Sequence, residues 1–254
     1  MRLFESFLVA LSTYSALPVP QFEWNERNMK YAICFFPAVG LICGGALWGW
    51  YQLCLMLGIS GVLFAAMAVC IPLLITGGIH MDGYMDTVDA LASHQPRERK
   101  LEIMKDSSSG AFAVIYCGVY LLLSLGLFYE LYERRQILDF CLAFVLSRAL
   151  SAFCAVSLPN ARKSGMLCAY TERAEKRNAA RCMILAAALT GTAMLCLSPI
   201  PGGTAVLFAA AVMLWYRRFA MKTFGGVTGD TSGFFLQLCE LACIIGVWIG
   251  GIGA

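Results

Sequence analysis

Residues 76–89, with the sequence TGGIHMDGYMDTVD, concentrate the side chains best suited to chemistry. If this segment is helical, Asp82, Asp86 and Asp89 are spaced so that their carboxylates form a narrow stripe on one face. Like charges in such a stripe repel unless a cation lies between them, and hard oxygen ligands of this kind suit Mg²⁺ or Mn²⁺. Gly83 lies inside the stripe, where the missing side chain would let a phosphate group approach the backbone. A solvated helix start, the alternative, accounts for one or two of these aspartates but not for three on one face.

The composition indicates an integral membrane protein. The chain has 254 residues, of which 59% are hydrophobic and only 14% are charged, against about a quarter in soluble domains. Its mean hydropathy is +0.71. We expect a single domain over residues 1–254, an all-α polytopic bundle in a lipid bilayer. Apolar runs long enough to span the bilayer, or nearly so, predict seven transmembrane helices at residues 31–56, 61–79, 110–130, 138–158, 182–197, 204–216 and 232–253.

Three smaller features complete the expected architecture. Residues 1–19 carry an apolar helical stripe interrupted by Arg2 and Glu5, which favours an interfacial or re-entrant helix over a cleaved signal peptide. Residues 198–203 predict a tight turn between the fifth and sixth spans. Gly40 and Gly44, and likewise Gly45 and Gly49, have the spacing of close helix packing. The twelve cysteines are scattered through apolar runs, so we expect packing roles and no zinc site.

The distribution of positive charge predicts the orientation. Almost all lysine and arginine residues fall on loops of one face, and Arg134 and Arg135 alone fall on the other. The positive-inside rule therefore places the N-terminus and the aspartate segment in the cytoplasm. The basic loop at residues 160–181 serves either substrate binding or attraction to lipid headgroups. A net charge of +3 without interleaved aromatic residues gives no indication of a nucleic-acid partner.

Two further clusters open predicted spans on the same face. Lys105, Asp106 and Ser107 precede the third span, where free backbone N–H groups at a helix start suit phosphate, although serine and aspartate are also ordinary caps. The glycine-rich segment 225–233 opens the last span and contains Gly226, Gly229 and Asp230, which could approach an anionic ligand or serve the metal.

Arg148 and Glu240 fall inside predicted spans, where an unpaired charge is costly. They either form a structural ion pair with each other or bind phosphate at the floor of a cytoplasmic cavity. We expect the second arrangement.

Together, GGIHMDGYMDTVDA, EIMKDSSSGAF and GGVTGDTSG with Glu240 resemble the adenosylcobinamide-GDP ribazoletransferase (cobalamin synthase) family over nearly the whole chain. Departures from the family pattern at Ala16, Ser108 and Gln237 concern local phosphate contacts. The resemblance implies a multi-pass protein of a prokaryotic cytoplasmic membrane that uses adenosylcobinamide-GDP and α-ribazole as substrates. A homo-oligomer remains an open alternative.

The implied reaction transfers the adenosylcobinamide phosphate moiety to α-ribazole, or its 5′-phosphate, and releases GMP. Mg²⁺ on Asp82, Asp86 and Asp89 would neutralise the leaving group, and Asp86 or Asp89, with His80 as a lesser candidate, would be the base. Lys105, Asp106 and the 225–230 loop would hold phosphates. The rival functions are a CDP-alcohol-type membrane phosphotransferase, whose arginine spacing differs, and a cation transporter, whose acids would lie near the membrane midplane.

Overall fold

The structure, a computed structural model, describes residues 2–20, 23–106 and 108–252, and these residues form helices and loops with no strand. In chain order the elements are α1 (Arg2–Tyr14), α2 (Glu26–Met29), the 3₁₀ helix η1 (Ala32–Phe35), α3 (Phe36–Leu57), α4 (Gly61–Thr76), α5 (Ile79–Ala92), α6 (Arg97–Ile103), α7 (Ala111–Glu133), α8 (Ile137–Ser157), α9 (Met166–Arg173), α10 (Lys176–Leu197), α11 (Pro199–Thr223) and α12 (Gly229–Gly250). The all-α polytopic membrane bundle predicted from the sequence is confirmed.

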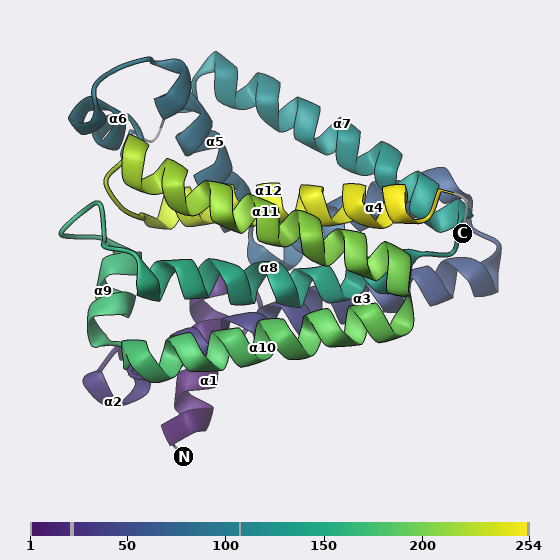
Figure 1. Cartoon of the computed structure of the whole chain (residues 1–254), viewed down its shortest axis with the longest axis horizontal. Coiled ribbons are helices and arrows are strands. Elements are labelled where there is room, and N and C mark those ends of the chain that lie inside the picture. The colour runs from purple at the N-terminus through teal and green to yellow at the C-terminus, as the bar shows by residue number, and fades with distance from the viewer. Residues whose placement is uncertain (1, 21–22, 107, 253–254) are drawn as a thin grey trace.

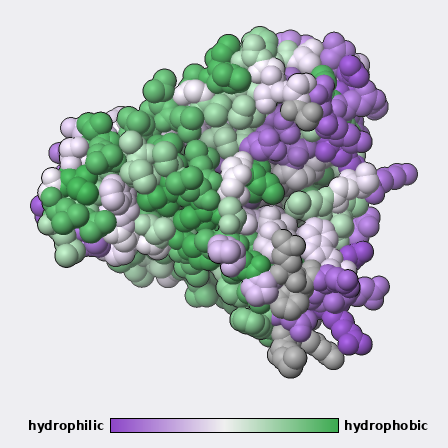
Figure 2. All heavy atoms as spheres, turned by 180° about the vertical axis from the view of Figure 1, so that it is seen from behind, coloured by the Kyte–Doolittle hydropathy of each residue, from purple (hydrophilic) through white to green (hydrophobic). Residues whose placement is uncertain are grey.

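The long helices run side by side along the long axis of the molecule, and the short helices α2, α6 and α9 gather at one end (Figure 1). Hydrophilic side chains are concentrated at one end of the surface, whereas apolar side chains cover much of the remainder (Figure 2). The most apolar stretches of α8 and α12 are 78% and 72% buried, against 22% in both α7 and α10. The centre of the bundle is therefore built on α8 and α12, while α7 and α10 present apolar side chains outward, as lipid-facing helices do.

Most predicted spans are confirmed. The two corrections concern the turn before α11 and the junction of α4 with α5. Six helices among the described residues are long and apolar enough to cross a membrane, and α4 with α5 makes a seventh if the bent pair counts as one span. The predicted turn at residues 198–203 is wrong in extent, because α11 already begins at Pro199, a residue whose fixed φ suits a first helical turn. Both α10 and α11 also extend beyond their apolar runs into basic residues at the hydrophilic end.

A sharp bend separates α4 from α5. The apolar run does not continue straight into the aspartate segment, because the axes of α4 and α5 meet at 95°. Gly77 and Gly78 have φ values of 63° and 76°, a left-handed backbone that glycine adopts without strain. The N–H of Ala16 donates to the carbonyl of Ile75 at 2.8 Å, so the segment after α1 is fastened to the last turn before the bend. The bend separates α5 from the spanning helix α4 and turns it across the hydrophilic end of the bundle.

Close helix contacts confirm part of the small-residue prediction. A Cβ atom on Gly40 or Gly44 would collide with backbone atoms of Phe144 or Cys141, so α3 and α8 are in direct backbone contact there. Gly45 and Gly49 have no neighbour within 4 Å of that position, and the packing role predicted for this second pair is wrong. The helix predicted at the N-terminus is present as α1, which buries Leu8, Val9 and Leu11.

A buried ion pair links the two central helices. Arg148 Nη1 of α8 lies 2.7 Å from Glu240 Oε1 of α12, and their side chains are only 1% and 5% exposed. The same guanidinium nitrogen donates to the Phe144 carbonyl at 3.0 Å, and the Ser147 hydroxyl donates to Glu240 at 3.2 Å. The two charges are thus paired with each other within the core, although Nε of Arg148 has no hydrogen-bond partner. The expected direct phosphate contact of Arg148 and Glu240 is replaced by this mutual pairing, since neither side chain lines the large cavity described below.

The ion pair makes a stability prediction. Arg148→Met or Glu240→Gln alone leaves one buried charge without its partner, which typically costs about 3–5 kcal/mol, whereas a buried pair removed together is often replaceable. We expect each single variant to lose thermal stability in detergent and the double variant to recover most of the loss. A double variant no more stable than the worse single variant would contradict this role.

The charge distribution makes a topological prediction. Gln95, beside α6, and Arg135, between α7 and α8, are both exposed. Because basic loops are retained in the cytoplasm, we expect a membrane-impermeant thiol reagent on intact cells to label Arg135→Cys but not Gln95→Cys. Permeabilised cells should show labelling of both variants, in a background without reactive native cysteines. The opposite pattern in intact cells would reverse the orientation.

Candidate active site

The site is organised by a close crossing of α5 over the beginning of α12. A Cβ atom on Gly83 would lie 2.8 Å from the carbonyl oxygen of Asp230, and one on Gly233 would lie 2.8 Å from the carbonyl oxygen of His80. Only glycine at these positions allows the two backbones to approach so closely. The backbone of α12 therefore fills the space beside Gly83. The glycine makes room for a helix crossing, whereas the sequence suggested that it makes room for a phosphate. As a consequence of this crossing, Asp82 and Asp230 line the same cavity.

The predicted aspartate helix is confirmed as α5, but its three carboxylates have different surroundings. Asp82 is exposed at the cavity, while Asp86 and Asp89 are half-buried. Burial, together with the negative charges of Asp82, Asp230 and Asp89, raises the pKa of Asp86 to about 7 against the opposing charge of Arg162. Four carboxylates thus influence one another electrostatically: the three of α5 that the sequence predicts to repel one another, and Asp230.

Asp89 is engaged with the start of α7. Its carboxylate accepts hydrogen bonds from the backbone N–H of Gly110 and, at 2.8 Å, from that of Ala113. These are N–H groups that have no partner within their own helix. Asp89 therefore caps α7 from a neighbouring helix, a role that sequence spacing did not indicate.

The oxygen ligands of the site fit Mg²⁺, although they form no preassembled cage. Among the described residues, no three His, Cys, Asp or Glu side chains converge in the manner of a complete metal site. Mg²⁺ is commonly held by one or two carboxylates together with substrate phosphates and water. Asp82 and Asp230 supply such carboxylates at the cavity, and the mutual repulsion around Asp86 favours a cation there.

Arg162 is the functional residue that the sequence analysis did not single out. Its Nη1 atom lies 2.9 Å from Asp230 Oδ2, and its Nη2 donates to the Leu101 carbonyl at 2.8 Å. The guanidinium therefore links the loop after α8 to α6 and to the first turn of α12. The sequence suggests substrate binding for the basic loop 160–181 as a whole, but it does not distinguish Arg162 from the other arginines of the loop.

The glycine-rich segment before α12 has two distinct parts. Gly226 has a φ of 157° and lies against the backbone of Pro159 and Ala161, where Val227 and Asn160 form an isolated parallel bridge. Gly226 thus permits chain packing in place of the expected phosphate contact. Thr228 caps α12 by accepting the N–H of Thr231 at 3.1 Å. Gly229 has nothing within 4 Å of a Cβ position and lines the cavity, so its backbone stays open to a ligand.

The remaining predicted phosphate-binding segment lies apart from the cavity lining. Lys105 and Asp106 are exposed, and Asp106 accepts the backbone N–H of Ser108 at 3.0 Å, which with the Ser108 hydroxyl lowers the pKa of its carboxyl. Ser107 lies outside the described residues. Gly110, farther along, meets Asp89 as described above. The structure brings this segment beside the aspartate helix without placing Lys105 or Asp106 in the cavity.

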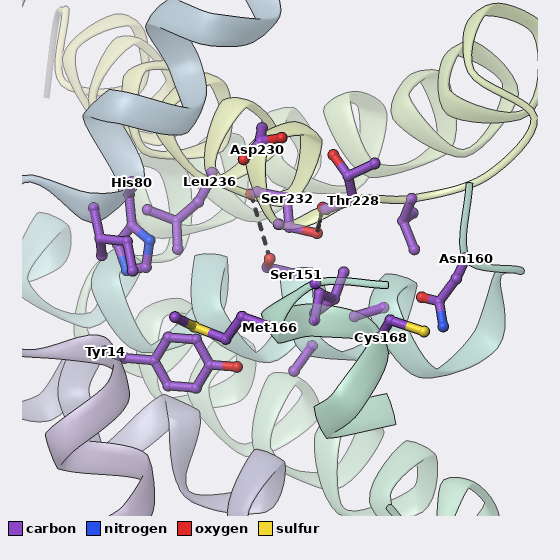
Figure 3. A pocket seen from close by; sticks show the side chains of 18 of the residues that line it. Tyr14, His80, Ser151, Asn160, Met166, Cys168, Thr228, Asp230, Ser232 and Leu236 are labelled. Atoms are coloured by element: carbon purple, nitrogen blue, oxygen red, sulfur yellow. Dashed lines mark hydrogen bonds between the residues drawn. The ribbon is translucent and has the colours of Figure 1, made fainter. Parts of the chain in front are cut away.

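The cavity has a volume of about 310 Å³ and extends from the acids into the bundle. Its acidic end contains Asp82, Asp230 and Gly229, with Arg162 beside them. Its inner end contains Tyr14, Phe36 and His80 and is otherwise walled mainly by apolar side chains. In Figure 3, Tyr14 and His80 lie together at one side, apart from Asp230 and Thr228. One continuous cavity thus joins a charged end to an aromatic end.

Comparison with known proteins gives a consistent result. The model of the cobalamin-5-phosphate synthase family matches residues 6–248. A protein of Lachnoclostridium phytofermentans named adenosylcobinamide-GDP ribazoletransferase is 42% identical over 98% of this chain and 95% of its own length. Proteins of the same name from Pseudomonas entomophila and Clostridium botulinum are 36% and 32% identical, over 95% and 94% of this chain and 97% and 95% of their own lengths. No solved structure matches. The chain, which the family model and these relatives match over nearly its whole length, is a member of the cobalamin-5-phosphate synthase family.

Proposed function

We propose that this enzyme transfers the adenosylcobinamide phosphate moiety from adenosylcobinamide-GDP to α-ribazole or its 5′-phosphate. A ribose hydroxyl attacks the phosphorus attached to the cobinamide, the bond to the bridging oxygen of the diphosphate breaks, and GMP leaves while the hydroxyl loses its proton. The products are adenosylcobalamin, or its 5′-phosphate, and GMP. The meeting of Asp82 and Asp230 at a cavity that also contains the open start of α12 supports this proposal in a chain of this family.

The acidic end supplies the groups that phosphoryl transfer requires. Asp82 and Asp230 would hold Mg²⁺, and the ion would supply charge neutralisation for the diphosphate and the leaving GMP. The backbone at Gly229 lies at the first turn of α12, where N–H groups and the helix dipole favour a phosphate. Arg162, already beside Asp230, is placed to pair with a phosphate oxygen.

The assignment of the base follows from the contacts of the aspartates. Both carboxylate oxygens of Asp89 already accept hydrogen bonds from backbone N–H groups at the start of α7. Asp82 and Asp230 line the cavity, where we assign them to the metal. Asp86 is the carboxylate of the stripe that remains for the proton of the attacking hydroxyl. It lies between the other two on α5, just outside the cavity lining.

Other functions fit the geometry less well. A transporter places its charged site near the membrane midplane. Here the acids lie where α5 crosses the first turn of α12, and the charges deeper in the bundle, Arg148 and Glu240, neutralise each other. A CDP-alcohol phosphotransferase would release CMP in place of GMP, so identification of the released nucleotide separates the two enzymes.

Asp82→Asn tests the metal-dependent transfer. Loss of a charged ligand at a metal and diphosphate centre typically lowers turnover by 100-fold or more, roughly the loss of one strong electrostatic interaction in the transition state. We expect such a loss in purified protein supplied with adenosylcobinamide-GDP, α-ribazole and Mg²⁺, measured as released GMP and complete corrinoid. EDTA should abolish the wild-type activity, and Mg²⁺ or Mn²⁺ should restore it.

Glu98→Gln is the matched control, because Glu98 is an exposed acid on α6 that does not line the cavity. It should retain near wild-type turnover, and both variants should insert into the membrane. Full activity in EDTA, or equal activity of the two variants, would exclude the assigned role of Asp82.

A further inference from the structure

Three rings from separate parts of the chain form the inner end of the cavity. Tyr14 ends α1, Phe36 begins α3 and His80 lies in the first turn of α5. The ring centroids of Tyr14 and Phe36 are 4.4 Å apart, and those of Phe36 and His80 are 5.5 Å apart. Tyr14 and His80 are nearly parallel at 6.5 Å. With Ile33, Ala152 and Leu236 beside them, they make an apolar surface suited to a flat aromatic ligand.

His80 adds one polar group to this apolar end. The side chain is only 6% exposed, and its Nε2 atom is buried without a hydrogen-bond partner. Buried polar atoms in folded proteins are normally paired, so His80 Nε2, like Arg162 Nε of the same cavity, lacks the partner that burial requires. Tyr14 and Ser151 also carry hydroxyl groups at this end, and that of Ser151 already has a contact, since it lies 3.5 Å from the Ser232 carbonyl.

We propose that the aromatic end binds the benzimidazole base of α-ribazole, with His80 Nε2–H donating a hydrogen bond to the free ring nitrogen of the base. The proposal rests on the proposed function and assigns one of its two substrates to a subsite. His80 Nε2–H is the donor that meets the single acceptor of such a base. Its methyl-bearing edge is apolar and matches the aliphatic and aromatic walls.

The other candidate occupant, the guanine of the GDP moiety, fits this end poorly. The edge of guanine carries several donors and acceptors, and burial of such groups without partners costs free energy. The inner end offers few partners for them: the polar groups Asp230, Thr228 and Asn160 lie away from Tyr14 and His80 (Figure 3). A corrin ring is excluded by size, since about 310 Å³ is at the small end of ligand pockets.

The connection between the two ends supplies the reason for such a subsite. His80 and Asp82 are two residues apart on α5, and both line the same cavity. A base held against His80 therefore leaves its ribose directed toward Asp82 and Asp230, where the attack on phosphorus takes place. Specificity for the base and orientation of the nucleophile come from the same helix.

The test is direct binding of α-ribazole, measured through the fluorescence of the base with purified protein in the absence of any corrinoid. We expect His80→Phe, which keeps a flat ring but removes the donor, to weaken α-ribazole binding by about 10-fold, the usual worth of one hydrogen bond. His80→Gln, which returns an N–H donor near the same position, should recover most of the affinity. GMP binding should change by less than about 2-fold in both variants, which also shows that they are folded.

A change in the ligand tests the same contact without any change in the protein. The indole α-riboside lacks the ring nitrogen, so wild-type protein should bind it about 10-fold more weakly than α-ribazole, whereas His80→Phe should bind the two equally. Equal binding of both ligands by the wild type would overturn the proposal. So would a loss of GMP affinity with unchanged α-ribazole affinity in His80→Phe, which would assign the aromatic end to guanine.

These outcomes are separate from the proposed reaction. Wild-type protein that releases GMP and forms the complete corrinoid while failing the indole comparison would refute the subsite alone. Protein that binds α-ribazole through His80 but releases no GMP would support the subsite and refute the transfer reaction.

Discussion

The crossing of α5 over α12 is the contact on which the site depends. It requires glycine on both helices, at Gly83 and Gly233, because any side chain there would meet backbone. It also requires the left-handed turn at Gly77 and Gly78, since a straight continuation of α4 would carry the aspartates away from the start of α12. The acidic residues are thus placed by glycines that do no chemistry. A bulky substitution at the crossing would separate Asp82 from Asp230 without altering either carboxylate.

The buried ion pair and the cavity are linked through one aromatic ring. The guanidinium of Arg148 lies 5.9 Å from the centre of the Phe36 ring, and Phe36 in turn contacts His80 and Tyr14. Pairing with Glu240 fixes the arginine, and its apolar contacts support the wall of the aromatic end from behind. Arg148 and Glu240, which the sequence suggested for phosphate binding, thus lie behind the aromatic end of the cavity and not at its acidic end. The Arg148 side chain is only 1% exposed, so almost none of its surface is open to a phosphate.

Much of the fold was predictable because membrane helices leave a strong signal. Apolar runs near 20 residues identified the spans, and spacing identified Asp82 and Asp86 on one helix. The bend between α4 and α5 was signalled by consecutive glycines, but no local rule gives its angle. The partners of Asp89, Arg162 and Arg148 depend on which helices meet, and a single sequence contains no measure of that. Gly83 and Gly226 were read as ligand contacts because a glycine beside a ligand and a glycine beside another backbone look alike in sequence.

The position of the acids also explains how a membrane protein can carry out chemistry on charged substrates. A carboxylate within the apolar core must be neutralised by a protein partner, as Glu240 is by Arg148. At the hydrophilic end, Asp82 stays exposed and Asp230 has a cationic neighbour that can exchange partners. Water and counterions there lower the cost of holding several acids together. The aromatic end needs the opposite environment, because an apolar base gains affinity from exclusion of water. A cavity that begins at the hydrophilic end and extends into the bundle provides both environments, and only there could one ligand have its base in an apolar pocket and its sugar beside the acids.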